Sequence, residues 1–137
     1  MNEFATFSEA ETAAAGREVG LTLHAGDVVL LRGPLGAGKT AFARGLAEGL
    51  GCDATDVSSP TFTIVQEYRG RTTLQHVDLY RLTPIEVDDL ALEDLMEAAV
   101  MAVEWPDRWP RAPTDAIDIT IDIIGESERK ITIRRQF

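Results

Sequence analysis

The residues that most clearly indicate chemistry are GPLGAGKT, from Gly33 to Thr40, which match G-x-x-x-x-G-K-[ST] at every fixed position. This pattern is typical of a loop that binds phosphate between a strand and a helix. Gly33, Gly36 and Gly38 would let the backbone curl and direct N–H groups at an anion. Lys39, which we expect to face solvent, would reach the outer phosphates, and the Thr40 hydroxyl would ligate Mg²⁺. The nucleotide should contact the whole loop: Gly33, Pro34, Leu35, Gly36, Ala37, Gly38, Lys39 and Thr40.

Two acidic residues are suited to hold the metal ion or its water near this loop. Asp78 follows the run LQHV, and Glu104 follows VMAV. Ligands in open α/β sheets bind at the carboxyl ends of strands, and a buried carboxylate needs a partner. Either acid alone could equally cap a turn, but the two together beside a phosphate loop favour a functional role. His24 and His76 lack metal-ligand spacing, and we expect both to be structural. Cys52 has no catalytic neighbours in the sequence.

Patterns of helix and strand alternate along the chain and could position these residues. Ser8, with Glu11 three residues later, forms the pattern of a capping box, so a helix should begin there. Apolar runs before the phosphate loop and before Pro106 indicate buried strands, and paired alternating runs indicate two hairpins. The expected helices span residues 8–20, 39–50 and 84–97, the strands 27–33 and 98–105, and the hairpin strands 61–68 with 72–80 and 116–124 with 128–135.

These elements predict an α/β fold. We expect a single domain, residues 1–137, with a P-loop NTPase fold. Its sheet should be mixed, parallel and antiparallel, with helices on both faces. The second hairpin should lie at an edge of the sheet.

Composition limits the partners and the compartment. The 137 residues include 13 basic and 23 acidic ones, a net charge of −10, which argues against direct binding of nucleic acid. The single cysteine allows no internal disulfide, and no apolar stretch approaches the length of a membrane span. The N-terminal MNEFATFSEAE lacks the basic flank and apolar run of a signal peptide. We therefore expect a cytoplasmic protein, without membrane contact, that meets nucleic acid only through partners.

Several classes of P-loop protein have no support in the sequence. The only asparagine is Asn2, so the N-K-x-D loop that selects guanine is absent. Asp78 is followed by Leu-Tyr-Arg instead of the x-x-Gly of a GTPase switch, and no LSGGQ-like segment of transporter ATPases occurs. A small-molecule kinase usually has an Arg-rich lid and an acceptor pocket, and the chain is short for both. A kinase that uses Asp78 as its general base remains an alternative.

Four stretches together closely resemble the TsaE (YjeE) family, the bacterial ATPases of the tRNA threonylcarbamoyladenosine pathway. They are, in order, GPLGAGKTAFARGL, VSSPTFTIVQEY, HVDLYRL and VEWPDRW. The resemblance extends from about Gly20 to Trp105, and the N-terminal helix and C-terminal hairpin also fit. Many families share the phosphate loop, whereas SPTF, DLYRL and EW in combination are specific. Pro34 and Ala41 depart from the family's common Asp and Thr, but neither position supplies a side chain that phosphate binding needs.

The resemblance implies catalytic and metal-binding roles. Thr40 and Glu104 would fall on the family's Mg²⁺ positions. Asp78 would be its Walker-B-like acid, needed for hydrolysis and placed near the metal. Thr61, in SPTF, would resemble the switch threonine of GTPases. The expected catalytic residues are thus Lys39, Thr61, Asp78 and Glu104, and the expected metal site is Thr40, Asp78 and Glu104.

The resemblance also implies contacts with the rest of the nucleotide. Trp105 would lie beside it, while Glu9 and Arg129 would edge the adenosine. For Arg81, which follows the HVDLY stretch, a surface ion pair is the simpler expectation.

Finally, the resemblance implies an activity. Family members bind ATP or ADP with Mg²⁺, hydrolyse ATP slowly, and act with the transferase TsaD and its scaffold homologue TsaB. They are required for threonylcarbamoylation of adenosine 37 in tRNAs that read codons starting with A, but they do not make that bond. We therefore expect a weak Mg-dependent ATPase that reaches tRNA only through partners. A nucleotide-sensing module without catalysis is a further alternative.

Overall fold

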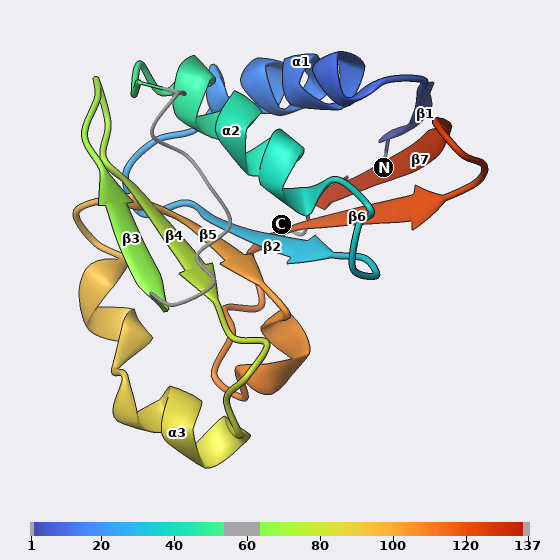
Figure 1. The fold of residues 1–137 in the computed structure, drawn as a ribbon. Coiled ribbons are helices and arrows are strands. Elements are labelled where there is room, and N and C mark those ends of the chain that lie inside the picture. The colour runs from blue at the N-terminus through green and yellow to red at the C-terminus, as the bar shows by residue number, and fades with distance from the viewer. Residues whose placement is uncertain (1, 54–63, 136–137) are drawn as a thin grey trace.

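A seven-stranded mixed sheet lies at the centre of residues 2–53 and 64–135, the part of the chain that the computed structural model describes (Figure 1). In space the strands follow the order β1-β7-β6-β2-β5-β4-β3. The strands are β1 (Asn2–Thr6), β2 (Val28–Arg32), β3 (Val65–Tyr68), β4 (Leu74–Asp78), β5 (Val100–Glu104), β6 (Ile117–Ile123) and β7 (Arg129–Arg135). Thr61 and the expected strand start at 61–63 lie outside the described residues.

The four central strands, β6, β2, β5 and β4, run parallel, and antiparallel strands flank them at both ends. Parallel strands are covered on both faces, which explains the continuous apolar runs in β2 and β5. Because they run parallel, the carboxyl ends of β2, β4 and β5 meet at one edge. The register pairs Asp78 with Glu104 at that edge.

Two helices cover one face of the sheet, α1 (Glu9–Gly20) and α2 (Lys39–Gly49) (Figure 1). The capping prediction for α1 is confirmed at Ser8, whose Oγ accepts a hydrogen bond from the Glu11 backbone N–H. The two helices approach closely where glycines face each other: a Cβ on Gly16 would meet the Phe42 carbonyl, and one on Gly45 the Ala13 carbonyl. The close contact fixes α2, and therefore the loop before it, against the sheet.

The opposite face is covered by shorter segments: α3 (Pro84–Asp89) and the 3-10 turns η2 (Leu92–Leu95) and η3 (Pro106–Arg108). Val87 and Leu92 from these segments, and Trp109 directly after η3, pack on the sheet in a second apolar cluster. The prediction of a mixed sheet with helices on both faces is therefore confirmed.

The helix expected at residues 84–97 is shorter than predicted. It starts as expected at Pro84, and Thr83 and Glu86 form a capping box around this first turn. It ends because Ala91 adopts a left-handed conformation with φ of 50°, and the chain continues as a 3-10 turn that buries Leu92. The apolar spacing continues across this break, so periodicity could not reveal it.

The N-terminal strand β1 was not predicted, and it corrects the position of the second hairpin. The β6–β7 hairpin exists, but β1 pairs antiparallel with β7 and forms the edge of the sheet in its place. All of β1 except Thr6 is exposed, so its sequence shows little apolar alternation. Backbone pairing rather than side-chain burial defines this strand.

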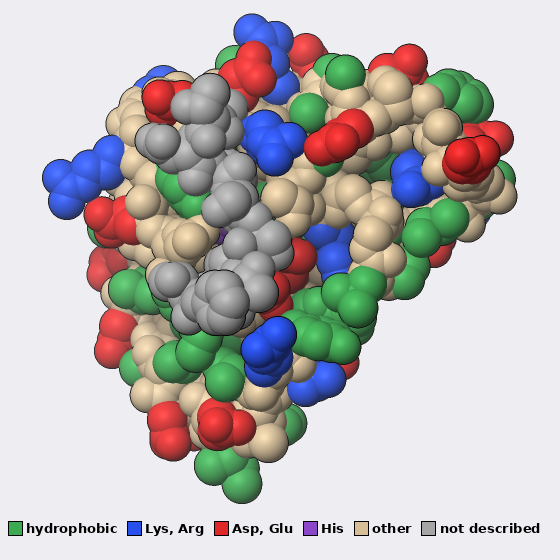
Figure 2. All heavy atoms as spheres, viewed as in Figure 1, with side chains coloured by type: hydrophobic (Ala, Val, Ile, Leu, Met, Phe, Trp, Pro, Cys, Tyr) green, Lys and Arg blue, Asp and Glu red, His purple; other side chains and the backbone are tan. Residues whose placement is uncertain are grey.

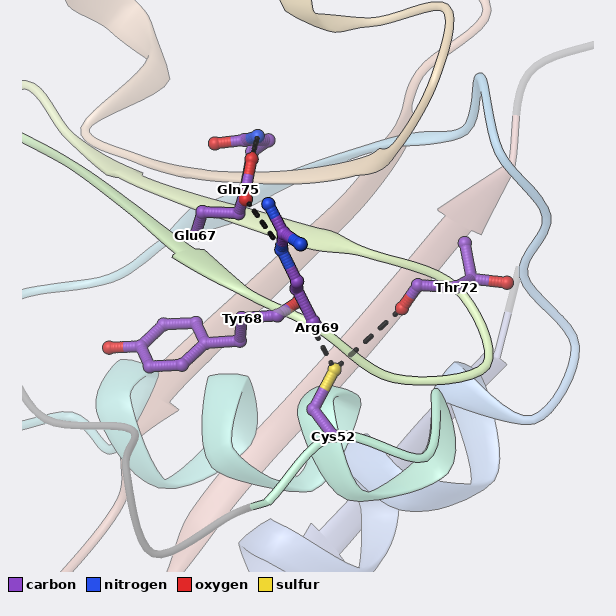
Figure 3. A network of polar contacts seen from close by, with 6 residues as sticks. All are labelled: Cys52, Glu67, Tyr68, Arg69, Thr72 and Gln75. Atoms are coloured by element: carbon purple, nitrogen blue, oxygen red, sulfur yellow. Dashed lines mark hydrogen bonds and ion pairs between the residues drawn. The ribbon is translucent and has the colours of Figure 1, made fainter.

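Cys52 links the β3–β4 hairpin to the end of α2 (Figure 3). The phosphate loop precedes the other end of that helix. The Cys52 thiol points at the carbonyls of Tyr68 and Thr72, at 3.5 and 3.7 Å. Across the hairpin, the Gln75 amide donates to the Glu67 carboxylate at 2.8 Å. Burial raises the pKa of the Cys52 thiol, which suits a structural residue. Among the described residues, no helix is long and apolar enough to cross a membrane.

Candidate functional site

The glycine-rich loop forms a tight curl between β2 and α2. Gly33, Gly36 and Gly38 have φ angles of 151°, 79° and 110°, values that side chains with a Cβ rarely adopt. At Gly33 a Cβ would also lie 2.5 Å from the Ile121 carbonyl oxygen. The curl ends at Gly38, so the first turn of α2 begins with Lys39 and its free N–H groups face the loop. A helix N-terminus and a curled backbone together attract an anion.

A pocket of about 930 Å³ opens beside this loop. Its walls come from the loop, the start of α1, the ends of β4 and β5, and the β6–β7 turn. In Figure 2, acidic and basic side chains lie close together near the middle of one face of the molecule. The expected site residues that line the pocket are Glu9, Leu35, Gly36, Ala37, Gly38, Lys39, Thr40, Asp78, Glu104, Trp105 and Arg129. Gly33 and Pro34 line a smaller hollow next to Trp105.

Lys39 is buried, with 5% of its surface exposed, so the expectation that it faces solvent is wrong. Its Nζ donates to the Gly33 carbonyl at 2.6 Å and lies 4.0 Å from the centre of the Trp105 ring. Burial lowers the pKa of the Lys39 amine, and the negative charges of Glu104, Asp78 and Asp107 oppose that shift. Desolvation therefore outweighs the attraction of these carboxylates, so the charged amine is held at a cost in free energy.

The acids Asp78 and Glu104 lie side by side on neighbouring strands. Burial raises the pKa of Asp78, a hydrogen bond from the Tyr80 backbone N–H to Oδ1 at 2.9 Å lowers it, and the charge of Glu104 raises it. Glu104 is 4% exposed, and its Oε2 lies 2.7 Å from Nε2 of His76. Both acids therefore lie at the ends of strands, as predicted.

The donor set of this site fits magnesium. No group of three or more His, Cys, Asp or Glu side chains within residues 2–53 and 64–135 could hold a metal alone. Thr40, Asp78 and Glu104 all line the pocket and offer one hydroxyl and two carboxylates. Mg²⁺ typically binds one or two carboxylates, keeps several waters and takes phosphate oxygens for the rest.

Trp105 is held in a strained conformation at the pocket mouth. Its φ of 59° is left-handed, which is uncommon for a bulky residue and costs free energy. This turn ends β5 and starts η3, and it places the indole against Lys39 and 5.0 Å from the Tyr80 ring. The left-handed turn thus fixes the ring on the wall of the pocket, beside Lys39.

Arg129 and Glu9 lie on the pocket wall and also contact the protein itself. The Arg129 guanidinium donates to the carbonyls of Ala37 at 3.1 Å and Gly36 at 3.4 Å, and so joins the phosphate loop to the β6–β7 turn. Glu9 accepts a hydrogen bond from Arg44 at 3.3 Å. A contact of either residue with adenosine stays a prediction.

Three residues near Asp78, His76, Tyr80 and Arg81, have positions at the site that their residue types did not predict. His76 is fully buried against Glu104, and its place two residues before Asp78, on the same face of β4, was the available signal. Tyr80 and Arg81 line the pocket. The surface ion pair expected for Arg81 is absent among the described residues, where its side chain is exposed at the pocket.

The strand, glycine-rich loop and helix at the carboxyl edge of a largely parallel sheet define a P-loop NTPase fold. Comparison with known proteins then narrows the class. The family model described as "Threonylcarbamoyl adenosine biosynthesis protein TsaE" matches residues 6–131. The chain belongs to the TsaE family, as its sequence motifs predicted.

Two relatives with the family name and one solved structure are similar to the chain over most of their length. The tRNA threonylcarbamoyladenosine biosynthesis protein TsaE of Treponema pallidum is 40% identical, over 92% of this chain and 95% of its own. The protein of the same name from Bacillus subtilis is 41% identical, over 93% and 81%. A solved structure described as the crystal structure of Bacillus subtilis YdiB has a TM-score of 0.78 at 33% identity, covering 98% of this chain and 84% of that one.

Proposed function

We propose that this protein binds Mg·ATP at the phosphate loop, hydrolyses it slowly, and uses this cycle in tRNA threonylcarbamoyladenosine biosynthesis. Family membership supports the pathway. The observation that supports the ATPase is the convergence of Lys39, Asp78 and Glu104 on one pocket beside the loop. The proposed location is the cytoplasm.

Each side chain has a defined task in this proposal. The loop N–H groups and the Lys39 amine bind the phosphates and neutralise their charge. Thr40 and Glu104 would hold Mg²⁺, which when bound withdraws charge from the phosphate oxygens. Asp78 orients the attacking water by accepting its hydrogen bond, and burial of the carboxylate strengthens that contact. Thr61, which lies outside the described residues, is proposed as the switch residue near the terminal phosphate.

The proposed partners are the transferase TsaD and its scaffold homologue TsaB. The chain has a net charge of −10 and so is poorly suited to grip tRNA itself. In this scheme the partners bind the tRNA and modify adenosine 37, and ATP hydrolysis here resets their complex.

A phosphate-release assay tests the proposal. Release from ATP should be slow with the protein alone, should require Mg²⁺, and should rise when TsaD and TsaB are added. Transfer of the phosphoryl group to a small hydroxyl compound, in a panel of acceptors, would instead support a kinase. Nucleotide binding without release or transfer under any condition would leave only a sensing module.

Trp105 should report nucleotide binding through its fluorescence. The indole lies 4.0 Å from the Lys39 amine, so bound phosphate will change the electric field at the ring. Adding Mg·ADP should change the emission of the wild-type protein. Trp105→Phe should abolish most of the change and Trp109→Phe should keep it, because Trp109, the only other tryptophan, is buried in the cluster on the opposite face. An unchanged signal in Trp105→Phe would move the nucleotide away from this pocket.

A further inference from the structure

His76 is an unusual residue for the interior of a sheet. It lies in the middle of β4 with none of its surface exposed. Leu74, His76 and Asp78 alternate onto the same face of that strand. Opposite them on β5, Glu104 pairs with Asp78 and Ala102 with His76. The small side chain of Ala102 leaves room for the imidazole to reach diagonally to the Glu104 carboxylate.

The contact is short, and among the described residues it is the only hydrogen bond of the ring. Nε2 lies 2.7 Å from Glu104 Oε2. Since a carboxylate oxygen accepts, the proton of this bond is on Nε2. Nδ1 is buried and has no hydrogen-bond partner among the described residues. A buried nitrogen without a partner is unfavourable, so packing alone would be better served by an apolar side chain such as Leu.

The contact determines how Glu104 faces the pocket. Glu104 is itself almost fully buried, so few waters can orient its carboxylate. With Oε2 bound to His76, Oε1 has no hydrogen bond to a described residue, and Glu104 is part of the pocket wall. Its charge also contributes most, among the nearby carboxylates, to the stabilisation of the Lys39 ammonium.

We propose that His76 is a positioning residue for magnesium binding: its Nε2–H holds Oε2 of Glu104 and so directs the other carboxylate oxygen into the pocket. This inference rests on the proposed function, in which Glu104 is a magnesium ligand. The proposed role of His76 depends on the hydrogen bond that its Nε2–H donates, and it requires no change of charge on the imidazole. Partners that orient a metal ligand in this way commonly alter metal affinity by about 10- to 100-fold when removed.

The test compares ADP affinity with Mg²⁺ and with EDTA, by calorimetric titration. His76→Leu fills the space but donates no hydrogen bond, whereas the side-chain amide of His76→Gln can donate one. His76→Leu should bind Mg·ADP about tenfold or more weakly while keeping its affinity for ADP in EDTA, and His76→Gln should restore most of the loss. His24→Gln, at the only other histidine, should change neither affinity. In a Glu104→Gln background, His76→Leu should have no further effect on the magnesium dependence.

Several results would overturn the inference. A folded His76→Leu variant with wild-type Mg·ADP affinity, or with equal losses in Mg²⁺ and in EDTA, would make His76 a core residue only. The same conclusion follows if both His76 variants unfold in circular dichroism, or if a folded His76→Gln variant lacks the magnesium dependence. Failure of the wild-type protein to bind Mg·ADP would instead contradict the proposed function.

Discussion

A Lys39→Met variant should remain folded and hydrolyse ATP on the order of 100-fold more slowly than the wild type, or worse, because it lacks the amine that meets the charge developing on the phosphates. Methionine retains most of the volume beside the Trp105 ring, whereas Lys39→Ala would leave a void next to a buried side chain. Burial lowers the pKa of Lys39, so the charged amine is less favourable in the fold than in the unfolded chain at pH 7. Its loss should therefore cost activity rather than folding, as measured by phosphate release and thermal unfolding.

The matched control is Lys130→Met, at the only other lysine of the chain. Lys130 lies on β7 with its side chain 44% exposed, pairs with Glu3 at 3.7 Å, and does not line the pocket. It should keep both activity and unfolding temperature. If a folded Lys39→Met protein hydrolysed ATP at the wild-type rate, the result would contradict the assignment of the phosphate site.

The sequence predicted the site best where the determinants are local. The phosphate loop needs glycines at its first and sixth positions and a helix directly after them, so Gly33 and Gly38 could be identified from spacing alone. Asp78 and Glu104 each follow a short run that is typical of a strand, and parallel strands bring such ends together.

The sequence failed where a side chain depends on its neighbours in space. Lys39 is buried because the left-handed turn at Trp105 places the indole over it. The residue types around Trp105 do not predict that turn. The His76 contact depends on the register of β4 and β5, with Ala102 opposite the ring. Patterns of burial also could not show β1, whose pairing with β7 uses the backbone.

Asp78→Asn should nearly abolish ATP hydrolysis while leaving Mg·ADP affinity within a few fold of wild type, since we propose that Asp78 orients water. Asparagine keeps an oxygen that can accept the Tyr80 backbone N–H, so the turn after β4 should survive. Glu104→Gln is the comparison: as a proposed metal ligand it should lose more affinity for Mg·ADP than for ADP in EDTA. Normal hydrolysis in both variants would make the two carboxylates structural.

The same Asp78→Asn variant should be more stable than the wild type in metal-free buffer at pH 7. Burial raises the pKa of Asp78 above its ordinary value of about 3.9, so the folded protein holds this proton more tightly than the unfolded chain does. The protonated carboxyl therefore stabilises the fold below about pH 3.9, and that contribution is lost as the pH rises through the folded-state pKa. Neutral asparagine avoids the loss, so its advantage in unfolding temperature should be full at pH 7 and shrink as the pH falls towards about 4. An unfolding temperature equal to or below that of the wild type at pH 7, with EDTA present, would show that the Asp78 carboxylate is not destabilised by its surroundings.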